Sequence, residues 1–594
     1  MAIDALCIAN FKAFAASQRV PLRPITLIYG ANSAGKSSVL HALALAHHAI
    51  ETGDLDSQRT QIGGEAIDLG GFRQYVHRRE RQRQVEFRFE LDPRQLSSRV
   101  AELLRSAQSV VVEVAIGEGR MANDAVMPSV SMGEKDQETG VATERFLLEV
   151  DGAPLLSMSA RASGRLRLDR LDHTHPVFRT LLQGLLLLAT TTQEIHEEDF
   201  AALTEVLDAI VPEIGAATRG GLFPRIEEEE SSAGEGEESW DPLLPVSRGR
   251  RHQDLARAVR LFVPKALRDL LEGLGATIEN NIRRLRYLGP LRSYPPRHLA
   301  FSQHHDPNWF AGGGYAWDVV RNRMDVRQRV NAWLGDAVRL KTPYELEVRD
   351  LMPAMALSRE LPDMLEEALH DFVASLVGFE GYGPQELSES VTKLVQQVAD
   401  TERDDQYELV PDIRELIEAA VDSEELCHRW TEVIRERSDV LRDLVLIDKR
   451  NGTRVSHRDV GIGISQVLPV LVSAYASENQ LLAIEQPEIH LHPALQAELG
   501  DVFLESALGE GNNTLLIETH SEHLLLRIMR RIRETSSDTL PDGVPPVTPD
   551  DVMVLFVEPD GAASLVREMP LNERGELVKA WPGGFFEEGL REIF

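Results

Sequence analysis

The sequence predicts an α/β fold that is organised around one phosphate-binding loop and assembled from the two ends of the chain. Residues 30–38 read Gly-Ala-Asn-Ser-Ala-Gly-Lys-Ser-Ser, between an apolar run at 25–29 and a helix-forming run at 39–45. Strand-like alternation follows in 85–168, and two apolar strands with polar ends lie far downstream, at 481–485 and 514–520. The order strand, G-x-x-x-x-G-K-S, helix is the context in which this motif binds phosphate.

The loop residues suit this task individually. Glycines let backbone N–H groups turn towards phosphate oxygens, and the helix that follows directs the positive end of its dipole at them. Lys36 is expected to reach the β- and γ-phosphates, and Ser37 to place its hydroxyl on Mg²⁺. The predicted nucleotide-binding residues are Gly30, Asn32, Ser33, Ala34, Gly35, Lys36, Ser37 and Ser38.

Length and composition restrict the possibilities. A chain of 594 residues with 43% hydrophobic residues fills two or more cores, or one large split domain with insertions. No apolar run reaches the ~18 residues of a membrane span, and 181–188 is interpreted as a buried helix. The first residues lack a secretory signal pattern, and Cys7 and Cys427 are the only cysteines. We expect a cytoplasmic protein without a membrane partner.

The net charge of −32 repels bulk nucleic acid, so any contact with DNA or RNA requires a local basic patch. Four runs are candidates, and each can equally be a solvated face. They are residues 78–81, 248–252, 283–286 and 527–533.

The N-terminal part predicts strands at 5–8 and 25–29, a helix from the phosphate loop to about 48, and an antiparallel sheet with one wet face. The sheet strands are expected at 85–91, 110–116, 144–150 and 164–168.

Helical periodicity dominates the middle of the chain. It covers 177–276, interrupted by an acidic stretch at 227–238 that we expect to be a loop, and returns at 316–334, 361–376 and 413–441. A strand is expected at 287–292, and Asn451-Gly452 predicts a hairpin between 444–448 and 453–455.

These patterns divide the chain into five segments. They are 1–170, an N-terminal lobe with the phosphate loop and the antiparallel sheet; 171–280, a helical insertion with the acidic loop; 281–300, a return to the core; 301–440, a second helical insertion; and 441–594, a C-terminal lobe.

Glu485 is the candidate metal carboxylate. In phosphate-loop folds an acidic residue at the end of a neighbouring apolar strand holds Mg²⁺ directly or through water. Glu485 follows four apolar residues in this way, and the alternative is a strand that merely ends at the surface. Together with Ser37, it is the predicted metal site.

Four motifs in order support a resemblance to a known group: Asn10-Phe11-Lys12, the segment 459–469, the segment 484–493 and Glu518-Thr519-His520-Ser521. Together they resemble the ABC-type ATPase heads of the SMC/RecF/OLD group. They are most similar to AAA-family ATPases with a C-terminal DUF3696-like segment, matched here by 581–586, and to the ATPase components of anti-phage systems such as OLD-like and Septu-type proteins. The motifs cover 1–95 and 440–594, and only 287–292 matches between them.

The resemblance implies a split phosphate-loop head of the ABC type and further site residues. Gly463, Ser465 and Gln466 correspond to the signature that closes over the γ-phosphate bound by a second subunit. His520 corresponds to the switch histidine, and His492 to the D-loop. A dimer around two ATP molecules, or a higher homo-oligomer, is the implied active state.

One position departs from that pattern. The residue after the metal carboxylate is usually Glu, but here it is Gln486, which cannot accept a proton at neutral pH. Gln486 can orient water, or Glu488 can act as the base. We therefore expect slow hydrolysis. The Q-loop residue is Gln61 or Gln74.

Nothing matches the Toprim nuclease domain of OLD proteins, so an effector is expected to be a separate nuclease or toxin. The leading hypothesis is a regulatory ATPase of an anti-phage complex. The alternatives are a RecF- or SMC-like ATPase that acts directly on DNA, and a nucleotide-gated scaffold with almost no turnover.

Overall fold

The chain folds into two units. The computed structural model describes residues 1–104, 106–120, 139–218, 221–226, 244–247, 249–292, 308–336, 339, 341–351, 441–455 and 462–586. The first unit contains residues 1–294, 304–342 and 457–594, and the second contains 295–303 and 343–456. The expected acidic loop at 227–238, the expected helix at 361–376, residues 413–440 of the next expected helix and the segment 459–461 lie outside the described residues, while Leu441, its last expected residue, begins a strand.

The core of the first unit is a six-stranded sheet with the order β11-β15-β16-β3-β17-β18. Strand β3 comes from the N-terminal part and pairs in parallel with two C-terminal strands, β16 and β17. It is buried along its whole length, as expected for a central parallel strand covered on both faces. The strands are β3 (Ile25–Gly30), β11 (Leu285–Leu288), β15 (Leu481–Glu485), β16 (Thr514–Glu518), β17 (Val552–Asp560) and the antiparallel edge strand β18 (Ala563–Glu568).

Helices α1 and α14 pack against β3 and β16. Helix α13 packs against α7 and α8. Helices α7 and α8 form where one helix was expected at 316–334, because the chain leaves helical geometry at Arg323. The helices are α1 (Lys36–Thr52), α7 (Gly314–Asn322), α8 (Met324–Gly335), α13 (Ile462–Ala476), α14 (Pro493–Leu508) and α15 (Glu522–Ser536).

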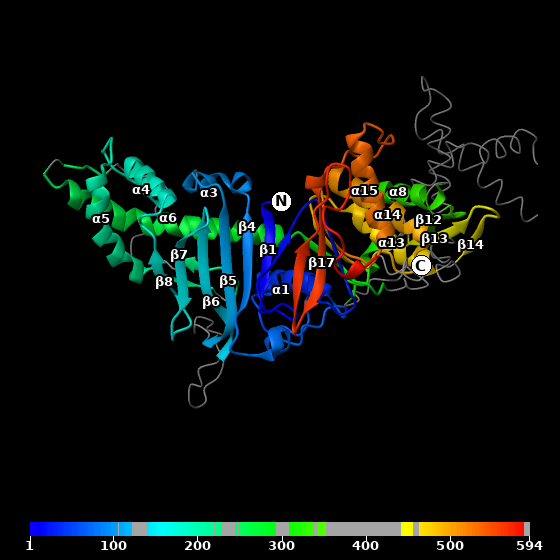
Figure 1. Cartoon of the computed structure of the whole chain (residues 1–594), viewed down its shortest axis with the longest axis horizontal. Coiled ribbons are helices and arrows are strands. Elements are labelled where there is room, and N and C mark those ends of the chain that lie inside the picture. Colours follow the sequence, from blue (N-terminus) through cyan, green and yellow to red (C-terminus); the bar gives the residue numbers. More distant parts are fainter. Residues whose placement is uncertain are drawn as a thin grey trace, which may run out of the picture. The chain divides into compact units, whose positions relative to one another are not determined.

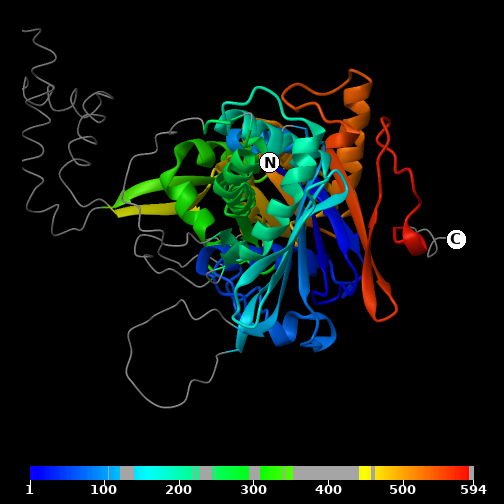
Figure 2. The same ribbon diagram turned by 90° about the vertical axis from the view of Figure 1, so that its left-hand side faces the viewer.

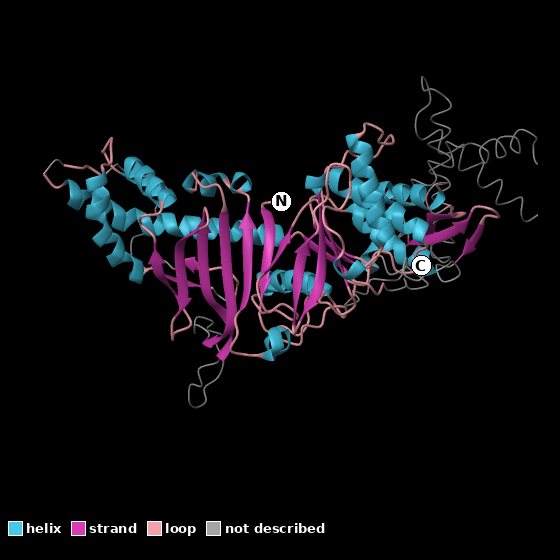
Figure 3. Cartoon of the chain, viewed as in Figure 1, coloured by secondary structure: helices cyan, strands magenta, loops and turns pink. Residues whose placement is uncertain are grey.

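A nine-stranded antiparallel sheet forms the other part of the first unit (Figures 1 and 3). Strand β4 alternates between buried and half-buried residues, so the predicted wet face is confirmed. Strands β7, β9 and β10 were not predicted, and the last two extend the sheet inside a span predicted as helical. In order along the chain the strands are β1 (Ile3–Ala9), β2 (Gln18–Pro21), β4 (Val85–Leu91), β5 (Val110–Arg120), β6 (Thr139–Val150), β7 (Ala153–Ala160), β8 (Leu166–Leu171), β9 (Gly215–Ala217) and β10 (Arg225–Ile226).

The predicted helical insertion contains α4 (Pro176–Ala189), α5 (Glu197–Ile210) and the long helix α6 (Arg251–Ile282). Helix α6, seen nearly end-on in Figure 2, contacts α3 (Ser98–Leu103), α4, α5 and α1. Helix α4 buries Leu182 and Leu186 but leaves Leu188 65% exposed, so the run at 181–188 is not buried throughout. No helix in the described part of the chain is long and apolar enough to cross a membrane.

The second unit contains an antiparallel sheet of β12 (Tyr344–Leu351), β13 (Leu441–Asp448) and β14 (Thr453–Val455). Gly452 in the predicted hairpin turn has φ 68°, which confirms the Asn-Gly signal. Strand β12 lies in a span predicted as helical, and its pairing with β13 places it in a sheet. The second unit ends at residue 456, and the first unit resumes at 457.

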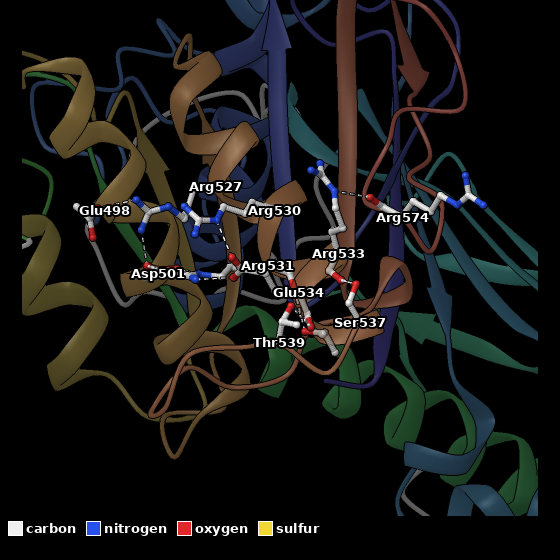
Figure 4. Close-up of polar contacts among 11 residues, drawn as sticks. Glu498, Asp501, Arg527, Arg530, Arg531, Arg533, Glu534, Ser537, Thr539 and Arg574 are labelled. Carbon is white, nitrogen blue, oxygen red and sulfur yellow. Dashed lines mark hydrogen bonds and ion pairs between the residues drawn. The ribbon is translucent and has the colours of Figure 1, made fainter.

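Helices α14 and α15 are joined by a buried network of ion pairs (Figure 4). Arg527 donates to Glu498 and Asp501 at 2.6 Å each, and Arg531 donates to both oxygens of Asp501 at 2.8 and 2.7 Å. Arg530 pairs with Glu534. Three arginines of the basic run at 527–533 are therefore paired with carboxylates of α14 or of α15 itself.

This network predicts that Asp501→Ala strongly destabilises the first unit. The substitution leaves two largely buried guanidinium groups without their shared carboxylate, and breaking such a pair costs about 3–5 kcal/mol. The free energy of unfolding in urea measures the effect. The control is Glu510→Ala, because Glu510 is 93% exposed in its pair with Arg329 and its loss is expected to cost under about 1 kcal/mol. Equal effects of the two substitutions would contradict the prediction.

Candidate nucleotide site

The predicted strand, loop and helix are present. Strand β3 ends at Gly30, and α1 begins at Lys36 after Gly35, which has φ 96°. A Cβ atom at Gly35 would lie 2.6 Å from the Cβ of Ala13, and one at Gly30 would lie 2.2 Å from the carbonyl oxygen of Val557. Both positions therefore require glycine, and the loop is held in one shape by its neighbours.

The Lys36 ammonium lies inside this loop. Its Nζ donates to the carbonyl oxygens of Gly30 and Ala31 at 3.1 and 3.0 Å, and lies 3.9 Å from the Oε1 of Glu518. Burial lowers the pKa of Lys36, although the nearby carboxylates oppose that shift. Asn32 and Ser33 are exposed at the tip of the loop. A phosphate at the tip would compete with two neutral carbonyl groups for the ammonium.

Ser37 contacts a carboxylate that the sequence analysis did not assign. Its hydroxyl donates to the Oε2 of Glu518 at 2.7 Å. Glu518 ends β16 in the same way that Glu485 ends β15, and the two are register partners in neighbouring parallel strands. The signal was present in the sequence, because 514–518 repeats the pattern of an apolar run followed by a carboxylate.

Glu485 lies at the same edge of the sheet, as predicted. The Tyr287 hydroxyl donates to its Oε1 at 2.8 Å, and the His41 Nε2 lies 3.6 Å from that oxygen. Burial, and then the charge of Glu518, raise the pKa of Glu485 to about 8. Burial and the neighbouring charge thus disfavour two ionised carboxylates at one edge, and a divalent cation would neutralise both.

This donor set fits Mg²⁺. Carboxylate and hydroxyl oxygens are its preferred ligands, and it usually takes one or two carboxylates while substrate phosphates and water fill the other positions. Within the described ranges no three His, Cys, Asp or Glu side chains converge as a cage of their own. The site therefore suits a metal that arrives with phosphates.

Lys12, from the Asn-Phe-Lys motif, lies against α1. Its Nζ is 2.6 Å from the Nδ1 of His41, and burial lowers the pKa of Lys12 to about 8. Burial and the Lys12 charge lower the pKa of His41 to about 3, so this imidazole is neutral and accepts at Nδ1. Phe11 and Phe14 are buried and bridge to each other, which holds the turn that presents Lys12.

Glu488 holds the turn after β16. Its two oxygens accept from the Thr519 hydroxyl at 2.8 Å and from the His520 backbone N–H at 2.7 Å. His520 is half-buried, and burial, followed by the charge of Lys36, lowers the pKa of its imidazole. Gln486 is half-buried with φ 43°, and its N–H donates to the Glu518 carbonyl. The geometry thus gives Glu488 a positioning role, and the role of Gln486 towards water stays a prediction.

The signature residues lie in the first turns of α13. Ser465 is only 1% exposed, so its hydroxyl faces the interior of its own chain. The Gln466 Nε2 donates to the Arg292 carbonyl at 3.2 Å, and Arg292 in turn donates to the Glu485 carbonyl at 2.9 Å. The signature helix is therefore fixed to the end of the Glu485 strand, and a contact from Ser465 to a second subunit requires this turn to move.

Other predicted interface residues are accessible. Gly463 is half-buried, and a Cβ there would lie 3.0 Å from the His490 carbonyl oxygen. His490 and His492 are exposed, and His492 Nδ1 accepts from the Ala494 N–H as the cap of α14. Gln61 and Gln74 are both exposed, so the geometry favours neither as the Q-loop residue.

The C-terminal aromatic segment packs at the base of the loop. The Tyr29 ring, next to Gly30, has its centroid 5.5 Å from that of Trp581 and 5.7 Å from that of Phe586. The Tyr29 hydroxyl donates to the Ser521 carbonyl at 3.0 Å. In the sequence, only the resemblance to a known family indicated a role for residues 581–586. The packing of Trp581 and Phe586 against Tyr29 explains why these two positions are aromatic.

The contacts of Glu488 predict that Glu488→Ala destabilises the protein in the absence of nucleotide. The substitution leaves the Thr519 hydroxyl and the His520 N–H without an acceptor, at about 1–3 kcal/mol for each buried group. Urea unfolding checks this, with Glu478→Ala at an exposed position as the control. Unchanged stability with lost turnover would instead favour Glu488 as the catalytic base.

Comparisons with known proteins agree with this arrangement. A family model described as "AAA domain" matches residues 5–120, and one described as "AAA ATPase domain" matches 342–525. A search of curated proteins finds no match.

Among solved structures, an SMC head bound to the C-winged helix domain of ScpA matches with 7% identity and a TM-score of 0.34, over 96% of this chain and 99% of that one. An Smc head bound to the C-terminal domain of ScpA from Pyrococcus furiosus matches with 9% identity and a TM-score of 0.32, over 100% and 98%. The SMC head domain from Thermotoga maritima gives 6% identity and a TM-score of 0.29, over 96% and 100%.

The sheet order confirms the predicted α/β class, with a core split between the two ends of the chain, an antiparallel β subdomain and inserted helices. The phosphate loop lies in the first matched segment, and Glu485, Glu518 and His520 lie in the second. Two segments that are far apart in sequence thus match models of AAA-type ATPase domains, and both contribute strands to the six-stranded sheet.

Proposed function

We propose that the chain binds ATP with Mg²⁺ at this site, hydrolyses it slowly, and dimerises around it. One observation carries the proposal: Lys36, Ser37 and Glu518 meet across 481 positions of sequence, at the same edge as Glu485. A buried ammonium, a hydroxyl and two carboxylates at the start of a helix have the charges needed to bind both a triphosphate and its cation.

Each residue of the site has its own proposed role. Loop N–H groups and Lys36 bind the β- and γ-phosphates, and Ser37 and Glu485 hold the Mg²⁺, which neutralises phosphate charge when bound. Gln486 orients the attacking water, and His520, on the turn fixed by Glu488, faces the γ-phosphate. Because an amide side chain cannot take the proton from water, this arrangement lacks the usual general base.

Slow turnover follows from Gln486. We expect a rate below about 10 s⁻¹, a typical enzyme median, at saturating ATP. Gln486→Glu supplies a base, which contributes about 10²–10⁴-fold where it is well placed, so an increase of at least about tenfold is expected. A phosphate-release assay with Lys36→Ala as the background control measures both. A faster native enzyme, or no gain in the variant, would contradict the assignment.

Dimerisation is supported by the exposure of His490 and His492, while Gly463 is half-buried. The mass of the protein in solution, measured by sedimentation with and without Mg²⁺ and ATP, is expected to double with both present. Lys36→Ala is expected to remain at the lower mass in every condition. A native mass that is independent of nucleotide would rule out the ATP-bound dimer.

The role we propose is regulation of a separate effector, a nuclease or toxin, in a bacterial anti-phage system. The net charge and the ion-paired run at 527–533 disfavour direct action on DNA, which stays the alternative together with a scaffold without turnover. ATP-stimulated DNA binding with a steep salt dependence would support the DNA alternative. A nuclease or toxin subunit that co-purifies with the protein would support the first.

A further inference from the structure

Glu518 is a buried carboxylate that none of the expected motif roles uses. It lies at the end of β16, 4% exposed, between the phosphate-loop strand β3 and the Glu485 strand β15. Its two oxygens face different loop residues: Oε2 accepts from the Ser37 hydroxyl, and Oε1 lies 3.9 Å from the Lys36 ammonium. A carboxylate is costly to bury, so its place among these groups needs an explanation.

The sheet register fixes where Glu518 can act. Glu518 pairs with Glu485 across two neighbouring parallel strands, and with Ile28, two residues before Gly30, on its other side. It therefore lies between Glu485 and the loop. The Ser37 oxygen, which we assign to the cation, is already bonded to Glu518 rather than to Glu485.

We propose that Glu518 is a second protein carboxylate of the Mg²⁺ site, acting directly or through a bound water. This inference rests on the proposed function and deepens it. In the form described here Glu518 accepts a hydrogen bond from Ser37. With Mg²⁺ and nucleotide present, both groups turn to the cation, and the Lys36 ammonium turns to the phosphates. Glu518 and Glu485 then share one cation in place of facing each other as like charges.

A purely structural role gives a different expectation. If Glu518 only holds Ser37 and Lys36 in the nucleotide-free loop, its charge competes with the triphosphate. Removing that charge would then tighten nucleotide binding equally with and without Mg²⁺. If Glu518 serves the cation, removing the charge weakens binding only when Mg²⁺ is present.

The test compares the dissociation constant of ATPγS in EDTA with that in excess Mg²⁺, by calorimetry on the full chain. The dissociation constant in EDTA divided by that in Mg²⁺ is expected to fall at least tenfold in Glu518→Gln. The dissociation constant in EDTA itself is expected to change little or to decrease. Glu518→Asp keeps the charge and is expected to recover part of the ratio. Glu505→Gln, which removes a half-buried, ion-paired carboxylate elsewhere in the same unit, is expected to keep the native ratio.

A second readout does not depend on nucleotide affinity. Titration of Mn²⁺ into the ATPγS complex, followed by electron paramagnetic resonance, reports the cation directly, and Glu518→Gln is expected to weaken Mn²⁺ binding at least tenfold. A native ratio and native Mn²⁺ binding in Glu518→Gln would overturn the inference and leave the proposed function standing. If the native protein shows no Mg²⁺-dependent nucleotide binding, both the proposed function and this inference fail.

Discussion

The hydrogen bond between Ser37 and Glu518 joins two residues that are 481 positions apart, and the rest of the site depends on the constraint that makes it possible. Strand β3 must insert between β16 and β17, in the register that brings Ile28 beside Glu518. The carboxyl ends of parallel strands meet at one edge of a sheet, so this insertion brings the loop, Glu485 and Glu518 together at once. A register slip of one residue would turn each carboxylate to the other face.

Buried charge is the cost of this arrangement, and each buried carboxylate is partly compensated. Glu488 has two donors from the Thr519–His520 turn, Glu485 has the Tyr287 hydroxyl, and Glu518 has the Ser37 hydroxyl. The hydrogen bonds of Glu488 differ from those of Glu485 and Glu518. Each oxygen of Glu488 accepts a hydrogen bond within its own fold, whereas Glu485 and Glu518 each accept one from a hydroxyl group, and burial raises the pKa of all three carboxyls. The proposed cation would be an additional partner for Glu485 and Glu518.

The sequence predicted most of the elements that position the site. Strands β3, β15 and β16 are buried on both faces, so they appear in the sequence as apolar runs followed by polar residues. Strand β4 is buried on one face, so it appears as a period-two alternation. A strand as short as β9 has too few residues to show a period. Strand β12 forms through its pairing with β13, a partner remote in sequence.

The site itself was predicted unevenly. The phosphate loop carries its own motif, so its residues were identifiable. Glu518 was overlooked because its partner, Ser37, is remote in sequence and a strand-end carboxylate looks the same whether it faces water or a hydroxyl. The burial of Ser465 likewise depends on how α13 packs, for example through the contact between Gln466 and Arg292. Residues this far apart in sequence give no local pattern from which the contact could be predicted.

The most direct test of the central claim is a structure of the chain with Mn²⁺ and a non-hydrolysable ATP analogue, in which anomalous scattering locates the cation. We expect the cation to be bonded to the Ser37 hydroxyl oxygen, beside Glu485. We also expect the Lys36 ammonium to have moved from the Gly30 and Ala31 carbonyls to the phosphates. A triphosphate bound elsewhere, or a Lys36 ammonium that keeps its present partners while the analogue is bound, would contradict this claim.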